Sequence, residues 1–340
     1  MSTRIWSLVA VTIITLVVGS SPPASAQAPA PAKPEAPAAT APPKAAPKVT
    51  VVTPRRFASA EEALQAFVAA LRTGDTKALV GILGSEGRPL VQSGDPVVDR
   101  QGREKFLAAY DAARRLEASG DTTVIHVGTD DWSFPIPLVK VGEGWRFDPR
   151  QGREEIVARR IGRNEIYTMQ TCLAYVDAQR EYYSEDHDGD GLLEYAQHFA
   201  SLPGKRDGLY WPTKTGEPPS PLGDLVVRAR AEGYRRDQSG GPTPFYGYLY
   251  RILTAQGPGA EGGEYDYIVR GHMIAGFALV AFPAQYGVSG VMTFIVNHDG
   301  VVYQKDLGPG TRAAALAMRK FNPDGTWVKA EVPEVAATRP

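Results

Sequence analysis

The chain has 340 residues, of which 43% are hydrophobic, 22% charged and 9% aromatic, as in an ordinary globular protein of one to three domains. Lys and Arg number 37 against 38 Asp and Glu, so the net charge of −1 gives no bulk attraction to nucleic acid or to an anionic membrane. The one cysteine, Cys172, excludes an intramolecular disulfide framework, a zinc–thiolate cluster and an iron–sulfur site.

The N-terminus has the features of a secretory signal peptide. Arg4 precedes the apolar run 5–18, and an A-x-A site ends at Ala26. These features predict a signal peptide over residues 1–26, cleaved after Ala26. The alternative is an uncleaved anchor, but the run is shorter than the roughly 18 to 20 residues that span a bilayer. We therefore expect an exported protein, periplasmic or extracellular, with no membrane span after signal cleavage.

Residues 27–56 are rich in Pro and Ala and carry no apolar periodicity. Proline at this density prevents a continuous helix, so we interpret the segment as an extended, semi-rigid linker.

Residues 57–152 have the pattern of a first α+β domain. The S-x-x-E capping box at Ser59–Glu62 predicts a helix that ends at Gly74, and further helices are expected over 76–83 and 102–116. The hydrophobic period then changes to two, which predicts strands over 123–127, 134–139 and 145–147. Helices followed by antiparallel strands indicate an α+β fold.

Residues 153–331 have the pattern of a second α+β domain. Apolar residues at helical spacing predict one helix from Glu154 to Ser184, about 45 Å long. An acidic loop and a proline-broken stretch follow, and then a short helix over 222–232. Strands are expected over 247–253, 277–281, 291–296 and 301–304, and residues 332–340 are expected to form a disordered tail.

Seven segments, found in a fixed order, resemble a known family. They are D-D-W-x-F-P-I-P (130–137), G-R-N-E (162–165), Y-V-D-A-Q-R-E-Y (175–182), D-G-D-G-L-L-E-Y-A (188–196), D-G-L-Y-W-P (207–212), G-Y-x-Y-R-I-L (247–253) and T-F-I-V-N-x-D-G-V-V-Y-x-K-D-L-G (293–308). The family is the bacterial domain of unknown function 2950 family, and the resemblance covers about residues 57–331. It implies a secreted bacterial protein with no established activity, and it supplies no catalytic residues.

Two further resemblances bear on architecture. The first domain resembles the nuclear transport factor 2-like fold, which implies a helix-wrapped curved antiparallel sheet around a cavity. The second resembles the globular part of pilin-like proteins, which implies a long helix packed on an antiparallel sheet. In pilins this helix continues an apolar N-terminus, whereas here it begins at polar Glu154 behind a whole domain. Pilin-type filament assembly is therefore not expected.

The acidic loop has the spacing of a Ca²⁺ site. The predicted ligands are the side chains of Asp186, Asp188, Asp190 and Glu194 and the carbonyl of Leu192. Alternate side chains direct oxygens inward, and the glycines allow the sharp bend. Gln197 stands where a bidentate Glu would add a strong ligand, so we expect modest affinity and a structural role, with the neighbouring Leu193 anchoring the loop to the core. The alternative is an acidic turn that caps the long helix and binds nothing.

No complete catalytic set is visible. The five histidines lack metal-ligand spacing, and the serines lack a G-x-S-x-G elbow. His126 is interpreted as a packed or surface residue, and Cys172 as an inert core thiol. Asp130 and Asp131 fit either a cavity mouth or an ordinary turn. The tyrosines of the second domain fit sheet packing better than a ligand-facing surface; they are Tyr246, Tyr248, Tyr250, Tyr265 and Tyr267.

These observations favour a non-enzymatic binding or envelope-associated protein, whose partner is an unknown ligand or envelope protein, with a calcium loop and no organic cofactor. One alternative is a small-molecule enzyme or ligand carrier that acts in the cavity of the first domain, with Asp130 or Asp131 as a base. Another is a component of a secretion or surface-assembly apparatus.

Overall fold

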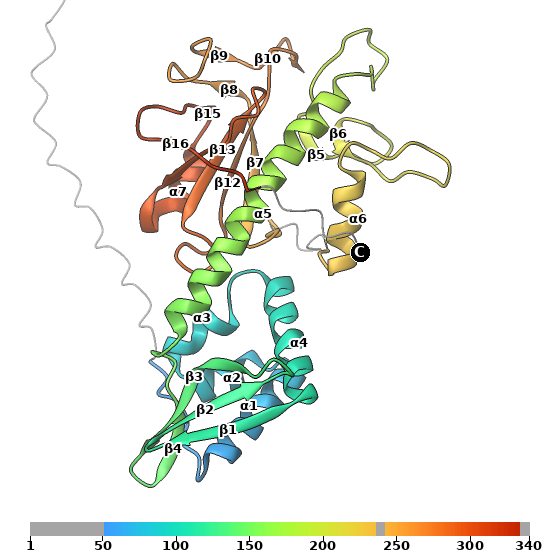
Figure 1. Cartoon of the computed structure of the whole chain (residues 1–340). Coiled ribbons are helices and arrows are strands. Elements are labelled where there is room, and N and C mark those ends of the chain that lie inside the picture. Colours follow the sequence, from blue (N-terminus) through green and yellow to red (C-terminus); the bar gives the residue numbers. More distant parts are fainter. Residues whose placement is uncertain (1–50, 236–241, 334–340) are drawn as a thin grey trace, which may run out of the picture. The chain divides into compact units, whose positions relative to one another are not determined.

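The computed structural model describes residues 51–235 and 242–333, which belong to one compact unit spanning residues 50–340. The predicted signal peptide, most of the 27–56 linker and the end of the 332–340 tail lie outside the described residues. The fold is α+β, with two hydrophobic cores that share one long helix (Figure 1).

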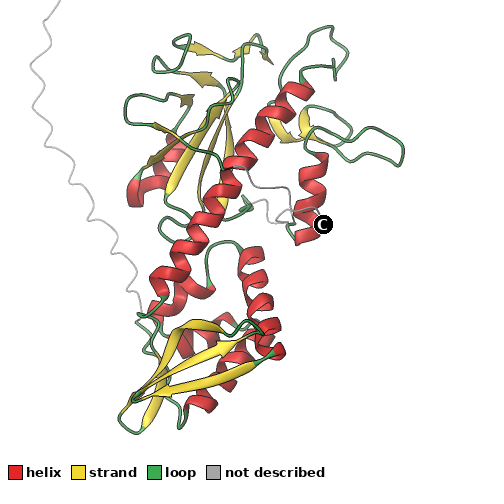
Figure 2. Cartoon of the chain, in the orientation of Figure 1, coloured by secondary structure: helices red, strands yellow, loops and turns green. Residues whose placement is uncertain are grey.

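The first core lies between short helices and a four-stranded antiparallel sheet, which is drawn in the lower part of Figure 2. The helices are α1 (Ala60–Thr73), α2 (Thr76–Leu83), α3 (Arg88–Val91) and α4 (Pro96–Ala112), with a 3₁₀ turn η1 (Ser85–Gly87). The strands β1 (Arg114–Ser119), β2 (Thr122–Val127), β3 (Trp132–Val141) and β4 (Gly144–Phe147) pair in chain order.

Side-chain caps fix the starts of these helices, as the sequence predicts for α1. The Ser59 Oγ atom accepts from the Glu62 backbone N–H at 3.1 Å, and the Glu62 carboxylate accepts from the Ala58 N–H at 2.9 Å. Gly74 then adopts a left-handed conformation (φ 66°), which ends α1 and allows Asp75 to cap α2.

The third helix differs from its predicted range of 102–116. It starts earlier, because Asp95 accepts from the backbone N–H groups of Val97 and Val98 and Pro96 occupies the first turn. It ends at Ala112, because residues 114–119 pair with β2 and place Leu116 opposite Ile125. This long-range pairing overrides the helical pattern of residues 113–116.

Helix α5 (Arg153–Tyr182) contributes to both cores (Figure 1). Ile156, near its start, packs on the first core, whereas Met169, Cys172 and Val176 are buried in the second. At 1.5 Å per residue its 30 residues extend about 45 Å. It ends two residues before the predicted Ser184.

The second core is built on a five-stranded antiparallel sheet with the order β16–β14–β13–β12–β7. Its strands are β7 (Tyr248–Leu253), β12 (Ala278–Pro283), β13 (Met292–Asn297), β14 (Tyr303–Asp306) and β16 (Val328–Lys329). The central strand β12 is buried along its whole length, and the Tyr175 hydroxyl of α5 donates to the Ala278 carbonyl at 3.3 Å. The sheet and α5 therefore pack directly together.

The remaining elements are small. They are α6 (Gly223–Glu232), α7 (Thr311–Ala317), the 3₁₀ turn η2 (Gly308–Gly310), the parallel pair β5 (His198–Ala200) and β6 (Gly208–Tyr210), the three-stranded sheet of β15 (Lys320–Phe321), β8 (Ala255–Gln256) and β9 (Tyr265–Asp266), and the hairpin of β10 (Ile268–Val269) and β11 (His272–Met273).

The G-R-N-E segment fastens α5 to the second core. The Asn164 side-chain amide donates to the Ser289 carbonyl at 2.8 Å. The Glu165 carboxylate accepts from the backbone N–H groups of Val291 and Met292, at 2.9 and 3.0 Å. These contacts lie just beyond the turns of α5 that face the first core, so they hold those turns in place.

Buried Asp95 links α4 to the chain around the second core. Its Oδ1 atom caps α4, and its Oδ2 atom accepts from the Tyr234 hydroxyl at 3.0 Å and the Gly247 N–H at 2.8 Å. Because the side chain is 0% exposed, these donors satisfy a carboxylate that has no access to water.

Candidate functional site

A cavity of about 510 Å³ lies in the first core, between α4, β3 and the first turns of α5. Its inner wall is aromatic and aliphatic. The Phe106 ring is 5.7 Å from that of Phe67 and 5.1 Å from that of Phe134, measured between centroids. Trp132 continues this wall toward solvent and is 38% exposed. The cavity thus combines an apolar interior with an open mouth.

Helical periodicity places both polar and apolar residues of α4 on the side that faces the cavity. On α4, Asp99, Gly102, Phe106 and Ala109 follow one another at three- and four-residue steps and therefore share one face. Gly102 has no atom within 4 Å of the position that a Cβ would take, so this face of α4 leaves open space at the cavity.

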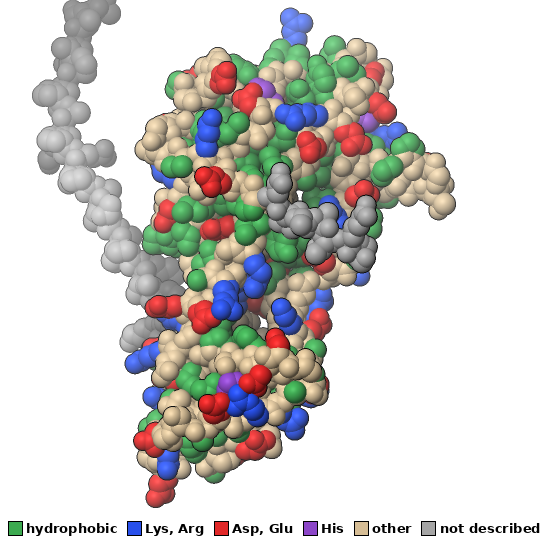
Figure 3. All heavy atoms as spheres, in the orientation of Figure 1, with side chains coloured by type: hydrophobic (Ala, Val, Ile, Leu, Met, Phe, Trp, Pro, Cys, Tyr) green, Lys and Arg blue, Asp and Glu red, His purple; other side chains and the backbone are tan. Residues whose placement is uncertain are grey.

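The charged residues of the lining are mostly basic. The basic ones are Arg103, Lys105, Arg159, Arg160 and Arg163, and the acidic ones are Asp99, Asp130 and Glu155. Figure 3 shows Lys and Arg side chains gathered over the first half of α5. The rim of the cavity therefore carries a net positive charge.

Two of the charged residues have structural partners inside the protein. The guanidinium of Arg160 is buried and donates to the carbonyls of Pro89 and Leu90 at 2.5 and 2.9 Å. Burial lowers the pKa of Arg160; the Asp99 carboxylate offsets part of this, and the positive charge of Arg163 adds to it. Asp99 accepts from the Ser93 N–H, but burial outweighs these bonds and raises its pKa.

The other four basic residues of the lining differ in whether they have a partner. Arg159 pairs with Glu155 at 2.5 Å. By contrast, Arg103, Lys105 and Arg163 make no hydrogen bond or ion pair with any residue in the described ranges 51–235 and 242–333. Their charges face solvent and the cavity mouth without a protein counter-charge.

The structure separates the two predicted carboxylates of the mouth. Asp130 lines the cavity, whereas Asp131 turns to the outer face of the sheet and pairs with Arg115 at 2.5 Å. Asp131 has a positive φ of 53°, which directs its side chain away from that of its neighbour. Only Asp130 remains a candidate for chemistry in the cavity.

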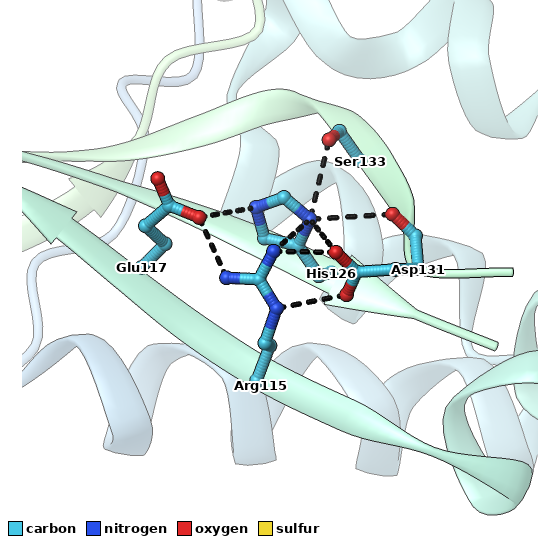
Figure 4. Close-up of polar contacts among 5 residues, drawn as sticks. All are labelled: Arg115, Glu117, His126, Asp131 and Ser133. Atoms are coloured by element: carbon cyan, nitrogen blue, oxygen red, sulfur yellow. Dashed lines mark hydrogen bonds and ion pairs between the residues drawn. The ribbon is translucent and has the colours of Figure 1, made fainter. Parts of the chain in front are cut away.

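Asp131 belongs to a polar cluster with Arg115, Glu117, His126 and Ser133 (Figure 4). His126, 8% exposed, has its Nε2 atom 3.3 Å from Glu117 and its Nδ1 atom 3.2 Å from the Ser133 hydroxyl. Arg115 donates to both carboxylates and lowers the pKa of Glu117 and of Asp131.

A hydroxyl beside an imidazole is the arrangement of an activated nucleophile, but this cluster lies elsewhere than the cavity. None of its five residues lines the cavity. The Arg115 guanidinium also lies 3.2 Å from the Nδ1 atom of His126, the same atom that the Ser133 hydroxyl contacts. The residues come from β1, β2, β3 and the turn before β3. We therefore assign the cluster to holding the three strands together, in line with the packed or surface role predicted for His126.

The predicted cation loop brings three carboxylates together. Oxygens of Asp186, Asp188 and Asp190 lie within 4.8 Å of one another, and all three residues are exposed. Asp186 accepts from the backbone N–H groups of Gly191 and Gly189, which lowers its pKa. These bonds shape the loop whether or not an ion binds.

The rest of the predicted ligand set is arranged differently. Glu194 contacts the Nδ1 atom of His272 at 3.2 Å, and the same atom lies 3.4 Å from Asp190. Leu192 and Leu193 are each 44% exposed, so Leu193 does not anchor the loop to the core as expected. Three carboxylates of the predicted set thus lie close together, and the ligand roles of Glu194 and of the Leu192 carbonyl stay predictions.

Calcium binding at the loop stays a prediction with a direct test. For a dissociation constant of about 10⁻⁴ M, 1 mM Ca²⁺ stabilises the folded state by about 1.4 kcal/mol. We expect a rise in melting temperature of a few degrees over EDTA, absent in Asp188→Ala/Asp190→Ala. An equal response of the double variant would contradict the site.

The other predicted residues are packed. Cys172 is fully buried, and burial raises the pKa of its thiol to about 12, as fits an inert core residue. Tyr248 and Tyr267 are 0% exposed, and Tyr246, Tyr250 and Tyr265 are partly buried, so the tyrosines serve packing.

Sequence reasoning missed the basic rim. It gave Arg159, Arg160 and Arg163 no role. The available signal was three arginines within five residues, in turns that follow directly on a predicted domain with a cavity.

Comparison with known proteins identifies a family and nothing closer. The model of a family described as a protein of unknown function (DUF2950) matches residues 54–330. No curated protein and no solved structure matches the chain. Among the described helices, none has the length and apolar character needed to cross a membrane.

Proposed function

We propose a function from the candidate site, because the chain belongs to the DUF2950 family, whose function is unknown. The protein binds an apolar small molecule in the cavity of its first core and does not transform it. The observation that carries this proposal is the cavity of about 510 Å³, whose size and apolar wall are typical of ligand sites.

The lining supports binding rather than catalysis. Among the described residues, it includes no Ser, Thr, Cys or His side chain to serve as nucleophile or base. Asp130 is exposed at the mouth, and Asp99 is bound to the Ser93 N–H. An enzyme acting in the cavity, the second candidate, would have to rely on these two carboxylates, on Glu155, which is paired with Arg159, and on Lys105.

The architecture agrees with the two resemblances seen in the sequence. Helices and an antiparallel sheet around a cavity support a nuclear transport factor 2-like first region. The packing of α5 on a five-stranded antiparallel sheet supports a pilin-like second region.

Filling the open space beside Gly102 is expected to weaken the binding of an apolar ligand in the cavity. In Gly102→Phe the new ring occupies the cavity mouth. The backbone of α4 should tolerate the change, because phenylalanine has a higher helix propensity than glycine. The readout is the fluorescence of N-phenyl-1-naphthylamine, a neutral apolar probe, whose dissociation constant should rise about tenfold or more, equivalent to about 1.4 kcal/mol.

The matched control is Gly162→Phe. Gly162 is also an exposed helical glycine with open space at its Cβ position, but it does not line the cavity. Equal probe binding by the two variants would contradict the proposal, as would a wild-type protein that does not enhance the fluorescence of the probe. Circular dichroism of both variants checks that they fold.

A further inference from the structure

We infer that the ligand is a single-chain lipid acid, with its acyl chain in the aromatic cavity and its carboxylate among the unpaired cations of the rim. This inference rests on the proposed function and adds the chemical class of the ligand. Two independent features carry it, namely the volume of the cavity and the charge of its mouth.

The volume selects one chain of moderate length. If a methylene group takes about the 30 Å³ that a water molecule occupies in the liquid, 510 Å³ accommodates about 17 heavy atoms. That is close to a saturated acid of about 14 to 16 carbons. The apolar interior of the cavity therefore has room for about one chain of this length.

The chemistry of the wall also selects an unfunctionalised chain. Phe67, Phe106 and Phe134 form the inner wall, together with Leu71 and Leu83. These side chains offer no hydrogen-bond donor or acceptor, so a sugar, nucleoside or peptide would lose its hydration there without compensation. Each added methylene should instead tighten binding about fourfold while it still fits.

The mouth selects an anion. Of the five basic residues on the lining, Arg160 is bound to backbone carbonyls and Arg159 is paired with Glu155. Arg103, Lys105 and Arg163 remain unpaired within the described parts of the chain, against one free carboxylate, Asp130. The surplus is therefore positive even after every internal pair has been counted.

The spacing of the arginines on α5 also favours an anionic ligand. Arg163 lies one turn after Arg159 on α5, and the buried guanidinium of Arg160 lies close enough to feel its charge, although the Asp99 carboxylate offsets this at Arg160 itself. Like charges so close are unfavourable in the empty protein, and an anion at the mouth would relieve that repulsion. A neutral or cationic ligand would leave it in place.

The experiment measures how well a homologous series displaces N-phenyl-1-naphthylamine from the full chain. Tetradecanoic acid should displace the probe at about tenfold lower concentration than tetradecan-1-ol, because a charge-assisted hydrogen bond replaces a neutral one. Along the series from decanoic to docosanoic acid, affinity should rise to about 16 carbons and then stop rising.

The variant for this test is Arg103→Gln/Arg163→Gln. Its acid-to-alcohol affinity ratio should fall from about tenfold toward one, because both unpaired guanidinium groups are removed. The matched control is Arg228→Gln/Arg312→Gln, which removes the same charge from exposed helix positions outside the lining and should keep the ratio.

The outcomes separate this inference from the proposed function. If the probe binds but acid and alcohol displace it equally, the cavity binds apolar ligands and the lipid-acid inference is wrong. A ratio unchanged in the Arg103/Arg163 variant, or affinity still rising at docosanoic acid, would also overturn it. A probe that does not bind at all would contradict the proposed function instead.

Discussion

Asp95→Ala is expected to lower the free energy of unfolding by about 4 kcal/mol, the largest effect of a single substitution that we predict. The carboxylate accepts four hydrogen bonds, two from the first turn of α4 and two from Tyr234 and Gly247. Loss of an N-cap costs about 1 kcal/mol, and each buried donor left without a partner costs about 1 to 3 kcal/mol.

Asp75→Ala is the matched control for this change. Asp75 caps α2 through the Ala78 N–H at 2.9 Å, but it is exposed and makes no second contact of the kind that Asp95 makes. It should lose only about 1 kcal/mol. Urea unfolding of the two variants gives the difference. Equal losses would mean that the link from Asp95 to Tyr234 and Gly247 adds nothing to stability.

Gly152→Ala is expected to destabilise the protein by about 3 kcal/mol and to weaken probe binding in the cavity. Gly152 precedes α5 with a φ of 73°, where a side chain costs about 1 kcal/mol. An added Cβ would also lie 2.2 Å from the Pro135 carbonyl oxygen, so the start of α5 must move away from β3. Because β3 and α5 are two walls of the cavity, the cavity changes shape.

Gly204→Ala is the matched control, which separates the backbone strain of a positive φ from the steric clash with Pro135. Gly204 has a similar φ of 78° and open space at its Cβ position, so it should show the backbone cost of about 1 kcal/mol alone. Thermal unfolding and the affinity for N-phenyl-1-naphthylamine are measured on both variants. If Gly152→Ala matched Gly204→Ala in both, the contact between Gly152 and Pro135 would not position α5.

Local signals in the sequence were enough to predict many of the elements. The capping box at Ser59 and the Gly74–Asp75 turn placed α1 and α2 at their observed positions. The long helix and four of the five strands of the large sheet were also predicted to within a few residues, whereas β16 was not predicted. In each case the pattern that reveals the element lies within a few residues of the chain, where periodicity and capping act.

Features that depend on distant residues could not be predicted in this way. Strand β1 is stabilised by pairing with β2, and nothing in residues 114–119 themselves opposes a helix. The partners of Asp95 are 139 and 152 residues away in sequence. His272 likewise reaches the acidic loop from 78 residues away. Such contacts follow from the tertiary fold and leave no local pattern.

The same limit applied to the candidate site. The cavity was expected from a resemblance, and a place at its mouth was one of two alternatives left open for Asp130. The arginines that complete the mouth belong to the helix assigned to the other predicted domain. Sequence reasoning that takes the two predicted domains one at a time cannot find a site whose residues come from both of these ranges.

The double role of α5 decides how this protein can be cut into fragments. Residues 155–163 supply five of the residues that line the cavity, yet they lie in the first turns of a helix whose later turns are buried against the large sheet. A fragment that ends at residue 152 would therefore have an open trough that lacks the three arginines of α5. A fragment that begins at residue 153 would have those arginines on an unsupported end of α5. The two isolated fragments, and any chimaera joined at this boundary, would therefore lack a complete cavity.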